Sequence, residues 1–355
     1  MIGDDTIMPQ LLLVGRDERR LAEIARANDL DNWTADLDAA LENPDYPIFF
    51  DAAATHMRAG ILRKALTAGK HIYAEKPIAP SVETGRTLLR DAESRGLKHG
   101  VVEDKLHLPG LLKLAGLVED GFFGRIVGFK LEFGWWVFDG IDRPAQRASW
   151  NYQRDAGGGL ISDMYPHWRY VIEGLLGPID KLVCAASTAQ GIWGEPTGDT
   201  FQVDVEDNAA TLLRMKSGVV GTILSSWATR VRREDLFTLQ IDGTDGSAVA
   251  GLRRCHGQRA GDTPEIKEFR MWAGQDTMDV AVDYFDGWRE VPDPGAYKNP
   301  YRHGWENFIA HVAADALFGS KLSAGVRDVE LSQACLHSAA SGERIEMSTA
   351  SEDVT

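Results

Sequence analysis

Cysteine is scarce in this sequence, and the three that occur are isolated. Cys184, Cys255 and Cys335 are the only cysteines among 355 residues, and no two of them form a C-x-x-C motif. This spacing indicates neither a zinc knuckle nor a disulfide framework, because both need clustered or paired cysteines. We therefore expect a protein of a reducing compartment, with the cytoplasm as its location.

Long apolar runs and an excess of positive charge are also missing. No stretch approaches the roughly 20 apolar residues that a membrane-spanning helix needs, and the apolar run 11–14 is too short for a signal peptide. The formal net charge of −15 disfavours nucleic acid and anionic membrane surfaces as partners. We expect a small-molecule ligand, no nucleic acid and no membrane.

What the sequence does contain is enough apolar material for two domains, since 44% of its 355 residues are hydrophobic. Short apolar runs alternate with amphipathic stretches up to about residue 102, which predicts a parallel sheet with helices on its faces. The expected strands are 11–15, 48–53, 71–74 and 99–102, and the expected helices are 18–28, 57–68 and 81–95. In such a sheet, ligands usually bind at the carboxyl ends of the strands.

After an expected helix at 111–119, the pattern changes to strand-like runs separated by turn residues. These runs are 126–138, 181–188, 208–215, 219–227, 236–242 and 247–251. Because few helices intervene, apart from one at 160–176, we predict a mostly antiparallel open sheet. The expected fold class is α/β plus α+β, with an α/β domain at 1–123 and a sheet domain at 124–355.

The motif Glu75-Lys76-Pro77 follows directly on the expected strand 71–74. A lysine at the carboxyl end of a parallel strand points into the ligand crevice, and the proline fixes the backbone of the turn. Its ammonium group can donate hydrogen bonds to a hydroxyl or a carboxamide. The simpler interpretation, a charged loop residue between a strand and a helix, stays open.

Three consecutive glycines, 157–159, precede the expected helix 160–176. Glycines let the backbone approach a ligand closely. Within the helix, Asp163 and His167 stand at i and i+4, which places them one above the other on one face. A carboxylate beside an imidazole orients the ring and raises its proton affinity, which suits a general acid/base acting on an alcohol.

Simpler interpretations of this second motif also stay open. An Asp/His pair at this spacing often forms only a local salt bridge, and a glycine triplet is often a flexible loop. A metal site is a third interpretation, although no further ligand stands at a recognisable spacing. The functional interpretation depends on the conjunction of both motifs.

A strand-end E-K-P followed by G-G-G-x-x-x-D-x-x-x-H resembles the Gfo/Idh/MocA oxidoreductases. The resemblance extends to Ala68-Gly-Lys-His71, Gly124-Arg-Ile126 and Gly243-Thr-x-Gly-Ser247. It implies a doubly wound Rossmann domain that holds NAD or NADP, and hydride transfer between the nicotinamide and a CH–OH group of a sugar, inositol or related polyol. It also implies a homodimer or homotetramer formed through the sheet of the second domain.

The same resemblance assigns roles to individual residues. Lys76 would lie beside the nicotinamide and the substrate hydroxyl, His167 would exchange the hydroxyl proton, and Asp163 would hold substrate and histidine in place. Lys105 stands where the family often has a substrate-facing basic residue. Three tryptophans are expected to offer flat walls to a sugar, unless they only pack in the core: Trp135, Trp136 and Trp150. The expected cofactor contacts are Gly15, Arg16, Thr55, Glu75, Lys76 and Pro77.

The end of the first expected strand bears on the choice between NAD and NADP. NAD-preferring relatives usually have an acidic residue here, whereas this sequence reads Gly15-Arg16-Asp17. A guanidinium suits a 2′-phosphate through paired hydrogen bonds, so we predict a preference for NADP. The alternative is that Arg16 only pairs with Asp17 or Glu18.

The sequence departs from the family at its start. The family's first strand and its G-x-G-x-x-G turn have no counterpart, because the run 11–14 matches its second strand. In the usual order this strand lies between the second and the fourth, and its turn carries the pyrophosphate. Either the recorded chain begins downstream of the true start, which we favour, or the loss is real and cofactor binding is weak. The competing hypothesis is therefore a non-catalytic sugar-binding or regulatory relative, with a metal-dependent hydrolase or isomerase as a distant third.

Overall fold

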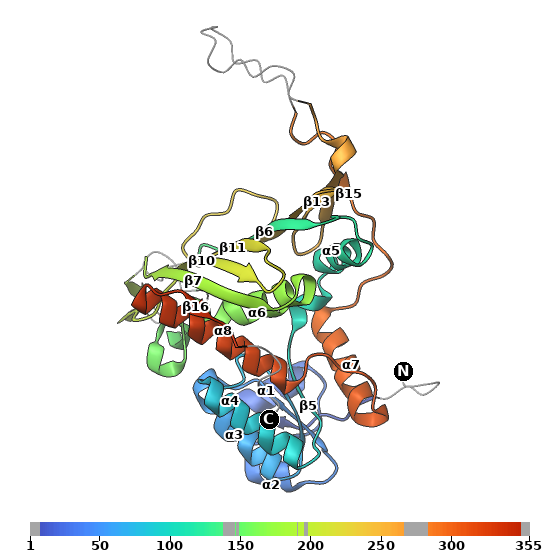
Figure 1. The fold of residues 1–355 in the computed structure, drawn as a ribbon. Coiled ribbons are helices and arrows are strands. Elements are labelled where there is room, and N and C mark those ends of the chain that lie inside the picture. Colours follow the sequence, from blue (N-terminus) through green and yellow to red (C-terminus); the bar gives the residue numbers. More distant parts are fainter. Residues whose placement is uncertain are drawn as a thin grey trace.

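Alternating strands and helices build the first part of the molecule, as the sequence predicts (Figure 1). The computed structural model describes residues 8–137, 146, 149–189, 191–194, 198–265 and 283–348. Ser81 caps the helix that follows the E-K-P motif, because its side chain accepts a hydrogen bond from Thr84 N. The elements of this part are β1 (Leu13–Val14), α1 (Glu18–Ala27), β2 (Trp33–Thr34), α2 (Leu37–Glu42), β3 (Ile48–Asp51), α3 (Thr55–Thr67), β4 (His71–Ala74), α4 (Val82–Ser94) and β5 (His99–Val101).

These strands pair in parallel, but within the described residues they form two separate sheets. One sheet contains β1 and β2, and the other has the order β3-β4-β5. The break between the two sheets falls between β1 and β3. These strands match the family's second and fourth strands, and the sequence analysis expects the strand that lies between them in the family to be missing.

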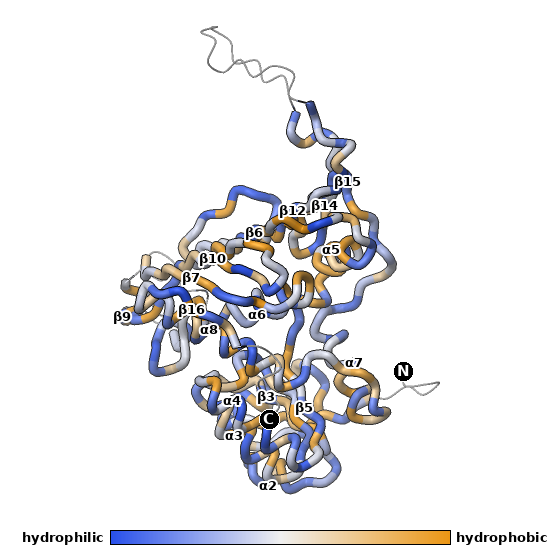
Figure 2. The backbone as a smooth tube through the Cα atoms, in the orientation of Figure 1, coloured by the Kyte–Doolittle hydropathy of each residue, from blue (hydrophilic) through white to orange (hydrophobic). Residues whose placement is uncertain are grey.

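The second part is built around one large sheet, as predicted. Its nine strands have the order β15-β14-β13-β12-β6-β11-β10-β7-β16, and β6 and β11 are parallel neighbours. Burial alternates strictly along β10, and Figure 2 shows hydrophilic and hydrophobic residues alternating along the strands of this sheet. The strand bounds are β6 (Ile126–Gly134), β7 (Ile179–Ser187), β10 (Asn208–Met215), β11 (Val220–Ser226), β12 (Phe237–Gly243), β13 (Gly246–Ala250), β14 (Cys255–Arg259), β15 (Arg289–Glu290) and β16 (Ile345–Glu346).

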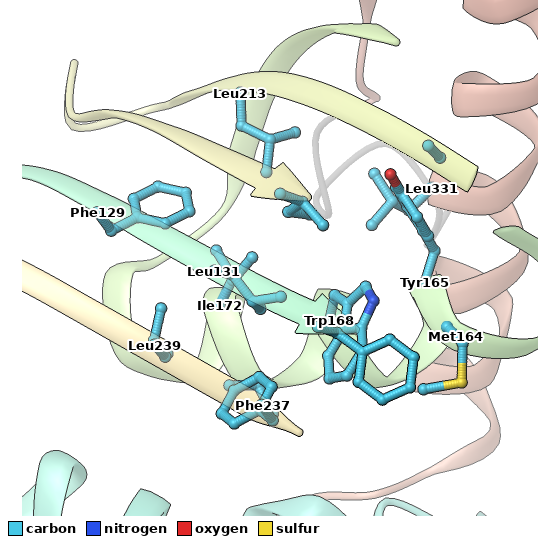
Figure 3. Packing of buried hydrophobic residues seen from close by; sticks show 14 of the residues in the cluster. Phe129, Leu131, Met164, Tyr165, Trp168, Ile172, Leu213, Phe237, Leu239 and Leu331 are labelled. Carbon is cyan, nitrogen blue, oxygen red and sulfur yellow. The ribbon is translucent and has the colours of Figure 1, made fainter. Parts of the chain in front are cut away.

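Helix α6 (Leu160–Leu176) covers the buried face of this sheet. Figure 3 shows Tyr165, Trp168 and Ile172 of this helix directed at the strands. The ring of Trp168 stacks on Phe237 of β12, with 5.3 Å between the ring centroids. Because this core is tightly packed, it fixes the helix that carries Asp163 and His167.

Two helices near the end of the chain return to the parallel part. In α7 (Pro300–Ala314) the ring of Phe308 stacks on Tyr73 of β4 at 4.7 Å, and α8 (Leu322–Ser341) packs on both α4 and α6. The division at 123/124 stays a prediction, but part of the chain after it packs on the α/β unit. None of the described helices combines the length and the apolarity that a membrane crossing requires. The remaining elements are η1 (Asp104–His107), α5 (Pro109–Glu119), η2 (Ser149–Tyr152), η3 (Arg154–Ala156), β8 (Ile192–Gly194), β9 (Thr200–Gln202) and η4 (Ala260–Asp262).

Candidate active site

A cleft of about 420 Å³ lies where the loops after β3 and β4 meet the start of α6. This place agrees with the rule that ligands bind at the carboxyl ends of parallel strands. Of the residues expected to contact substrate or cofactor, seven line the cleft: Thr55, Glu75, Lys76, Pro77, Trp135, Trp150 and Asp163. The cleft is also lined by Ala52, Ala53, Arg58, Gln146, Asn151, Gly157, Gly158 and Ser162.

Lys76 and Asp163 meet across this cleft. The Nζ atom of Lys76 lies 2.7 Å from Oδ1 of Asp163 and 2.7 Å from its backbone oxygen. The side chains are only 11% and 15% exposed, so solvent screens this ion pair much less than a surface pair. The two motifs that the sequence analysis treats separately are therefore one unit in space.

A buried arginine fixes the turn that carries Lys76. Arg58 of α3 donates to the carboxylate of Asp51 at 2.6 Å, to the backbone oxygen of Pro77 at 2.6 Å and to that of Ala53 at 2.5 Å. Because the guanidinium fork bonds both loops of the cleft at once, it holds their backbones at a fixed separation. The sequence analysis did not single out Arg58 or Asp51.

The glycine triplet lets the chain enter α6 at the edge of the cleft. A Cβ atom on Gly158 would lie 2.4 Å from the backbone oxygen of Asn151, so only glycine fits there. Gly159 has a φ of 115° and offers no side-chain cap to the helix. Glu206 supplies the missing acceptor, since its Oε1 atom lies 2.8 Å from Ile161 N.

His167 lies one helical turn beyond Asp163, and it is not among the cleft-lining residues. The imidazole is 7% exposed, and its Nδ1 atom lies 2.6 Å from the Tyr170 hydroxyl. The sequence analysis expects Asp163 to orient this ring, but the carboxylate that the structure places at Nδ1 is Asp104, at 3.6 Å. The sequence analysis did not single out Asp104 or Tyr170. Tyr170 lies near His167 through the i, i+3 spacing of α6, whereas Asp104 reaches it only because η1 packs on α6.

Lys105 contributes to the same group of side chains. Its Nζ atom lies 3.1 Å from Oδ2 of Asp104, and the lysine side chain is 20% exposed. The structure thus places Lys105 beside Asp104 and not among the residues that line the cleft.

The two neighbouring tryptophans on the loop after β6 face different surroundings. Trp135 lines the cleft, whereas the ring of Trp136 is covered by the guanidinium of Arg230, whose carbon lies 3.9 Å from the ring centroid. Successive side chains of extended backbone point to opposite sides, which explains the difference. Trp150, a few residues before the glycine triplet in the sequence, also lines the cleft.

Several carboxylates make the site electronegative around Lys76. Burial raises the pKa of Glu75 in the E-K-P motif, while Lys76 and Arg58 oppose that shift. Burial, followed by the charges of Asp104, Glu75 and Asp163, raises the pKa of Tyr301 to about 12. Tyr301 stands in the first turn of α7 and was not singled out from the sequence. The influence of these three carboxylates on its pKa shows that α7 begins near the site.

The remaining predicted cofactor contacts lie at the carboxyl end of β1. Gly15 and the exposed Arg16 follow this strand, and among the described residues no ion pair joins Arg16 to Asp17 or Glu18. Asp17 instead caps α1, accepting a hydrogen bond from Arg20 N at 3.0 Å. The open guanidinium and the polar cleft at the ends of β3 and β4 fit the two ends of a nicotinamide dinucleotide. Among the described residues, no three or more histidines, cysteines or carboxylates are grouped to hold a metal ion.

Comparison with known proteins agrees with this arrangement. The sequence model of the oxidoreductase family with an NAD-binding Rossmann fold matches residues 11–102, and that of the GFO/IDH/MocA C-terminal domain matches 111–249. A D-xylose dehydrogenase of Paenarthrobacter nicotinovorans is 39% identical over 331 residues, which cover 92% of this chain and 84% of that enzyme. A levoglucosan dehydrogenase of Pseudarthrobacter phenanthrenivorans is 29% identical over 249 residues, covering 66% of this chain and 62% of the enzyme.

The fold is also found among solved structures. A levoglucosan dehydrogenase in complex with NADH and levoglucosan has a TM-score of 0.79 to this structure, at 22% identity over 96% of this chain and 90% of that one. The predicted fold class, a Rossmann-like domain followed by a mostly antiparallel sheet, is confirmed. The chain therefore belongs to the Gfo/Idh/MocA family and is an NAD(P)-dependent oxidoreductase.

Proposed function

We propose that this protein is a dehydrogenase of a small aldose, with D-xylose as the first substrate to test. The observation that carries the proposal is the Lys76–Asp163 pair at 2.7 Å inside a cleft of about 420 Å³. A lysine and a carboxylate at one point can together bind a hydroxyl, since one donates and the other accepts. The 39% identity to a D-xylose dehydrogenase supports the choice of substrate.

In this proposal each residue has a distinct task. Lys76 donates a hydrogen bond to the oxygen of the reacting carbinol, and Asp163 holds both Lys76 and a neighbouring hydroxyl. His167 accepts the hydroxyl proton as the general base. Trp150 and Trp135 offer apolar surface to the sugar ring.

The reaction balances with these groups. The carbinol C–H bond breaks with its electron pair, the O–H proton moves to His167, and the C=O bond of the product forms. The bound nicotinamide supplies the hydride acceptor. Thr55, Glu75 and Pro77 line the part of the cleft that would hold it, and Gly15 and Arg16 would hold the adenosine end.

A substrate screen with a lysine variant tests this proposal. The protein is assayed for NAD(P)H formation with D-xylose, other aldoses, inositol and polyols. In Lys76→Met we expect kcat/KM to fall at least about 100-fold, because the donor is lost and Asp163 keeps a poorly paired charge. The control is Lys64→Met, which removes an exposed pair with Asp38 whose side chains are 55% and 69% exposed and should leave kcat/KM unchanged.

Two outcomes would contradict the proposal. Equal activities of Lys76→Met and the unsubstituted protein would remove the lysine from the chemistry. Sugar binding without NAD(P)H formation from any substrate would favour the alternative, a sugar-binding or regulatory relative.

We also propose that the protein assembles through the open face of its large sheet. Each of three neighbouring strands directs an apolar side chain outward, with Val183, Leu212 and Leu224 exposed by 40%, 51% and 51%. Val183 pairs directly with Leu212, and Leu224 lies on the adjacent strand. An apolar patch of this kind is typical of a subunit interface.

A further inference from the structure

The Tyr170 hydroxyl has three hydrogen-bonding partners, and together they determine where the proton of His167 lies. The hydroxyl oxygen is 3.2 Å from Oδ1 of Asp104, 3.3 Å from Lys105 N and 2.6 Å from Nδ1 of His167. Tyr170 and His167 are both buried, so protein groups rather than bulk water satisfy this hydroxyl.

Each partner restricts the hydroxyl in a different way. The carboxylate of Asp104 only accepts, and its other oxygen pairs with the ammonium of Lys105 at 3.1 Å. The backbone N–H of Lys105 only donates. The single hydroxyl proton must therefore point at Asp104, and the oxygen must accept from Lys105 N.

One lone pair of the hydroxyl then remains for His167, so Nδ1 has to be the donor. We propose that Asp104 and Tyr170 are positioning residues that hold His167 in the tautomer with its proton on Nδ1 and its lone pair on Nε2. The inference rests on the proposed function, in which His167 takes the substrate proton. A general base needs its lone pair on the nitrogen that faces substrate, and with the proton on Nδ1 that nitrogen is Nε2.

The same network serves the protonated ring. When Nε2 takes up a proton, Nδ1 still donates to Tyr170, so no hydrogen bond has to reverse. The carboxylate of Asp104, 3.6 Å from Nδ1 and 9% exposed, stabilises the positive charge of the imidazolium. The other titratable or charged groups around this point come from η1, α6, α7, α8 and the loops after β4 and β5. They are Lys105, His107, Glu103, Arg169, Asp328, Asp163, Glu75, Lys76 and Tyr301.

The tautomer can be measured without any activity. In protein labelled with ¹⁵N-histidine, long-range ¹H–¹⁵N spectra distinguish the protonated ring nitrogen from the one with the lone pair, and His167→Gln identifies the signal. We expect the neutral ring of His167 to carry its proton on Nδ1. In Asp104→Asn the carboxamide can donate to Tyr170 as well as accept from it, so we expect a mixture of both tautomers.

Kinetics test the consequence for the proton transfer. The ascending limb of the kcat/KM profile for sugar oxidation reports the deprotonation of the base. In Asp104→Asn we expect this limb to move to lower pH by about one unit, because a facing carboxylate charge is lost. We expect kcat at neutral pH to fall about tenfold or more, and KM to stay within about threefold, since the base weakens and its tautomer is no longer fixed.

Tyr170→Phe is the second variant, and it leaves the carboxylate in place. We expect it to shift the limb less than Asp104→Asn, while Asp104→Glu restores part of the wild-type profile. The matched control is Tyr165→Phe on the same helix, whose buried hydroxyl bonds Thr211 at 2.7 Å in the sheet core and not the site. Thermal unfolding of each variant verifies that it is folded.

The outcomes separate this inference from the proposed function. A proton on Nε2 in the unsubstituted protein would overturn the inference, whatever the activity. An unmoved pH limb in a folded Asp104→Asn variant would reduce Asp104 to a structural role. A proton on Nδ1 in a protein that oxidises no sugar would refute the proposed function alone.

Discussion

Arg16 is the single residue on which the choice of cofactor depends. It is exposed directly after β1, and in the described part of the chain no ion pair joins it to its acidic neighbours, so its guanidinium is available to a 2′-phosphate. In Arg16→Ala we expect kcat/KM with NADP⁺ to fall about 10–100-fold, the loss of one or two charged hydrogen bonds, and little change with NAD⁺. Steady-state kinetics with each cofactor measure this.

The control for this prediction is Arg26→Ala, because Arg26 is exposed at the opposite end of α1. Removing the Arg26 guanidinium changes the net charge of the protein as much as Arg16→Ala does, but leaves the end of β1 unaltered. If the unsubstituted protein prefers NAD⁺, or if both arginine variants behave alike, the guanidinium of Arg16 does not select the cofactor.

A local motif is what allows the sequence to single out individual residues. Lys76 and Asp163 belong to such motifs, and they meet in the cleft. Asp104 and Tyr170 have no comparable signal, because an aspartate after a strand and a tyrosine in a helix are common. Tyr170 meets His167 through the i, i+3 spacing of α6, and only the packing of η1 on α6 brings Asp104 to the same ring.

At the scale of elements, two important helices begin without a cap of their own. Gly159 and Lys321 precede α6 and α8, and neither offers a side-chain acceptor. Another element supplies the acceptor in each case: Glu206 for α6, and His99, whose Nδ1 lies 3.2 Å from Leu322 N, for α8. Such distant caps leave no mark in the local sequence, which is one reason why α8 was not predicted.

Helix α7 was also not predicted, although its sequence does carry a signal. Asn299 accepts hydrogen bonds from Tyr301 N and Arg302 N, and Pro300 occupies the first helical position. An asparagine cap followed by proline is a typical helix start. The hydrophobic pattern that follows is weak, because this helix buries little more than Gly304 and Phe308.

The cap of α8 predicts a pH dependence of stability. His99 has to be neutral to accept from Leu322 N, and burial, followed by the charges of Lys321 and His311, lowers its pKa to about 4. Since the unfolded value is about 6.5, the contribution is complete above pH 6.5 and is lost as pH falls from 6.5 towards 4. The difference between the folded and unfolded pKa values of His99 corresponds to at most about 3 kcal/mol of unfolding free energy.

Urea unfolding at several pH values between 7 and 4.5 measures this loss. In His99→Gln, whose amide oxygen can still accept but cannot be protonated, we expect a smaller loss of stability over the same range. His337→Gln, which changes an exposed histidine of α8, is the control and should follow the unsubstituted protein. Identical pH slopes in all three proteins would remove His99 as the titrating cap.

At the scale of the whole molecule, the sequence predicts two sheets of different type but not their strand order. Alternation with helices predicts the parallel part, and turn-separated strands predict the antiparallel part. The central parallel pair of β6 with β11 was not predictable, since it joins segments about 90 residues apart with α6 and four strands, β7 to β10, between them. Long-range pairing of this kind depends on the packing of α6 against the sheet rather than on local pattern.

The open face of that sheet yields the prediction about assembly. The register places Val183, Leu212 and Thr222 in one row across three strands, and Ala210 and Leu224 in the next. These outward side chains would gain about 25 cal/mol per Å² of apolar surface buried against a second copy. We therefore expect light scattering to give a mass of two or four times the 39.1 kDa of one chain.

Replacing the centre of this patch should separate the subunits. In Leu212→Lys/Leu224→Lys, like charges would face each other across a twofold interface, and we expect the mass of a single chain with a native circular dichroism spectrum. Ile24→Lys, which places a lysine on the exposed part of α1, should keep the assembled mass. Because β10 and β11 also form the floor on which α6 packs, the monomeric variant should lose unfolding free energy as well. A double-lysine variant that keeps the oligomeric mass would show that the subunits meet through another face.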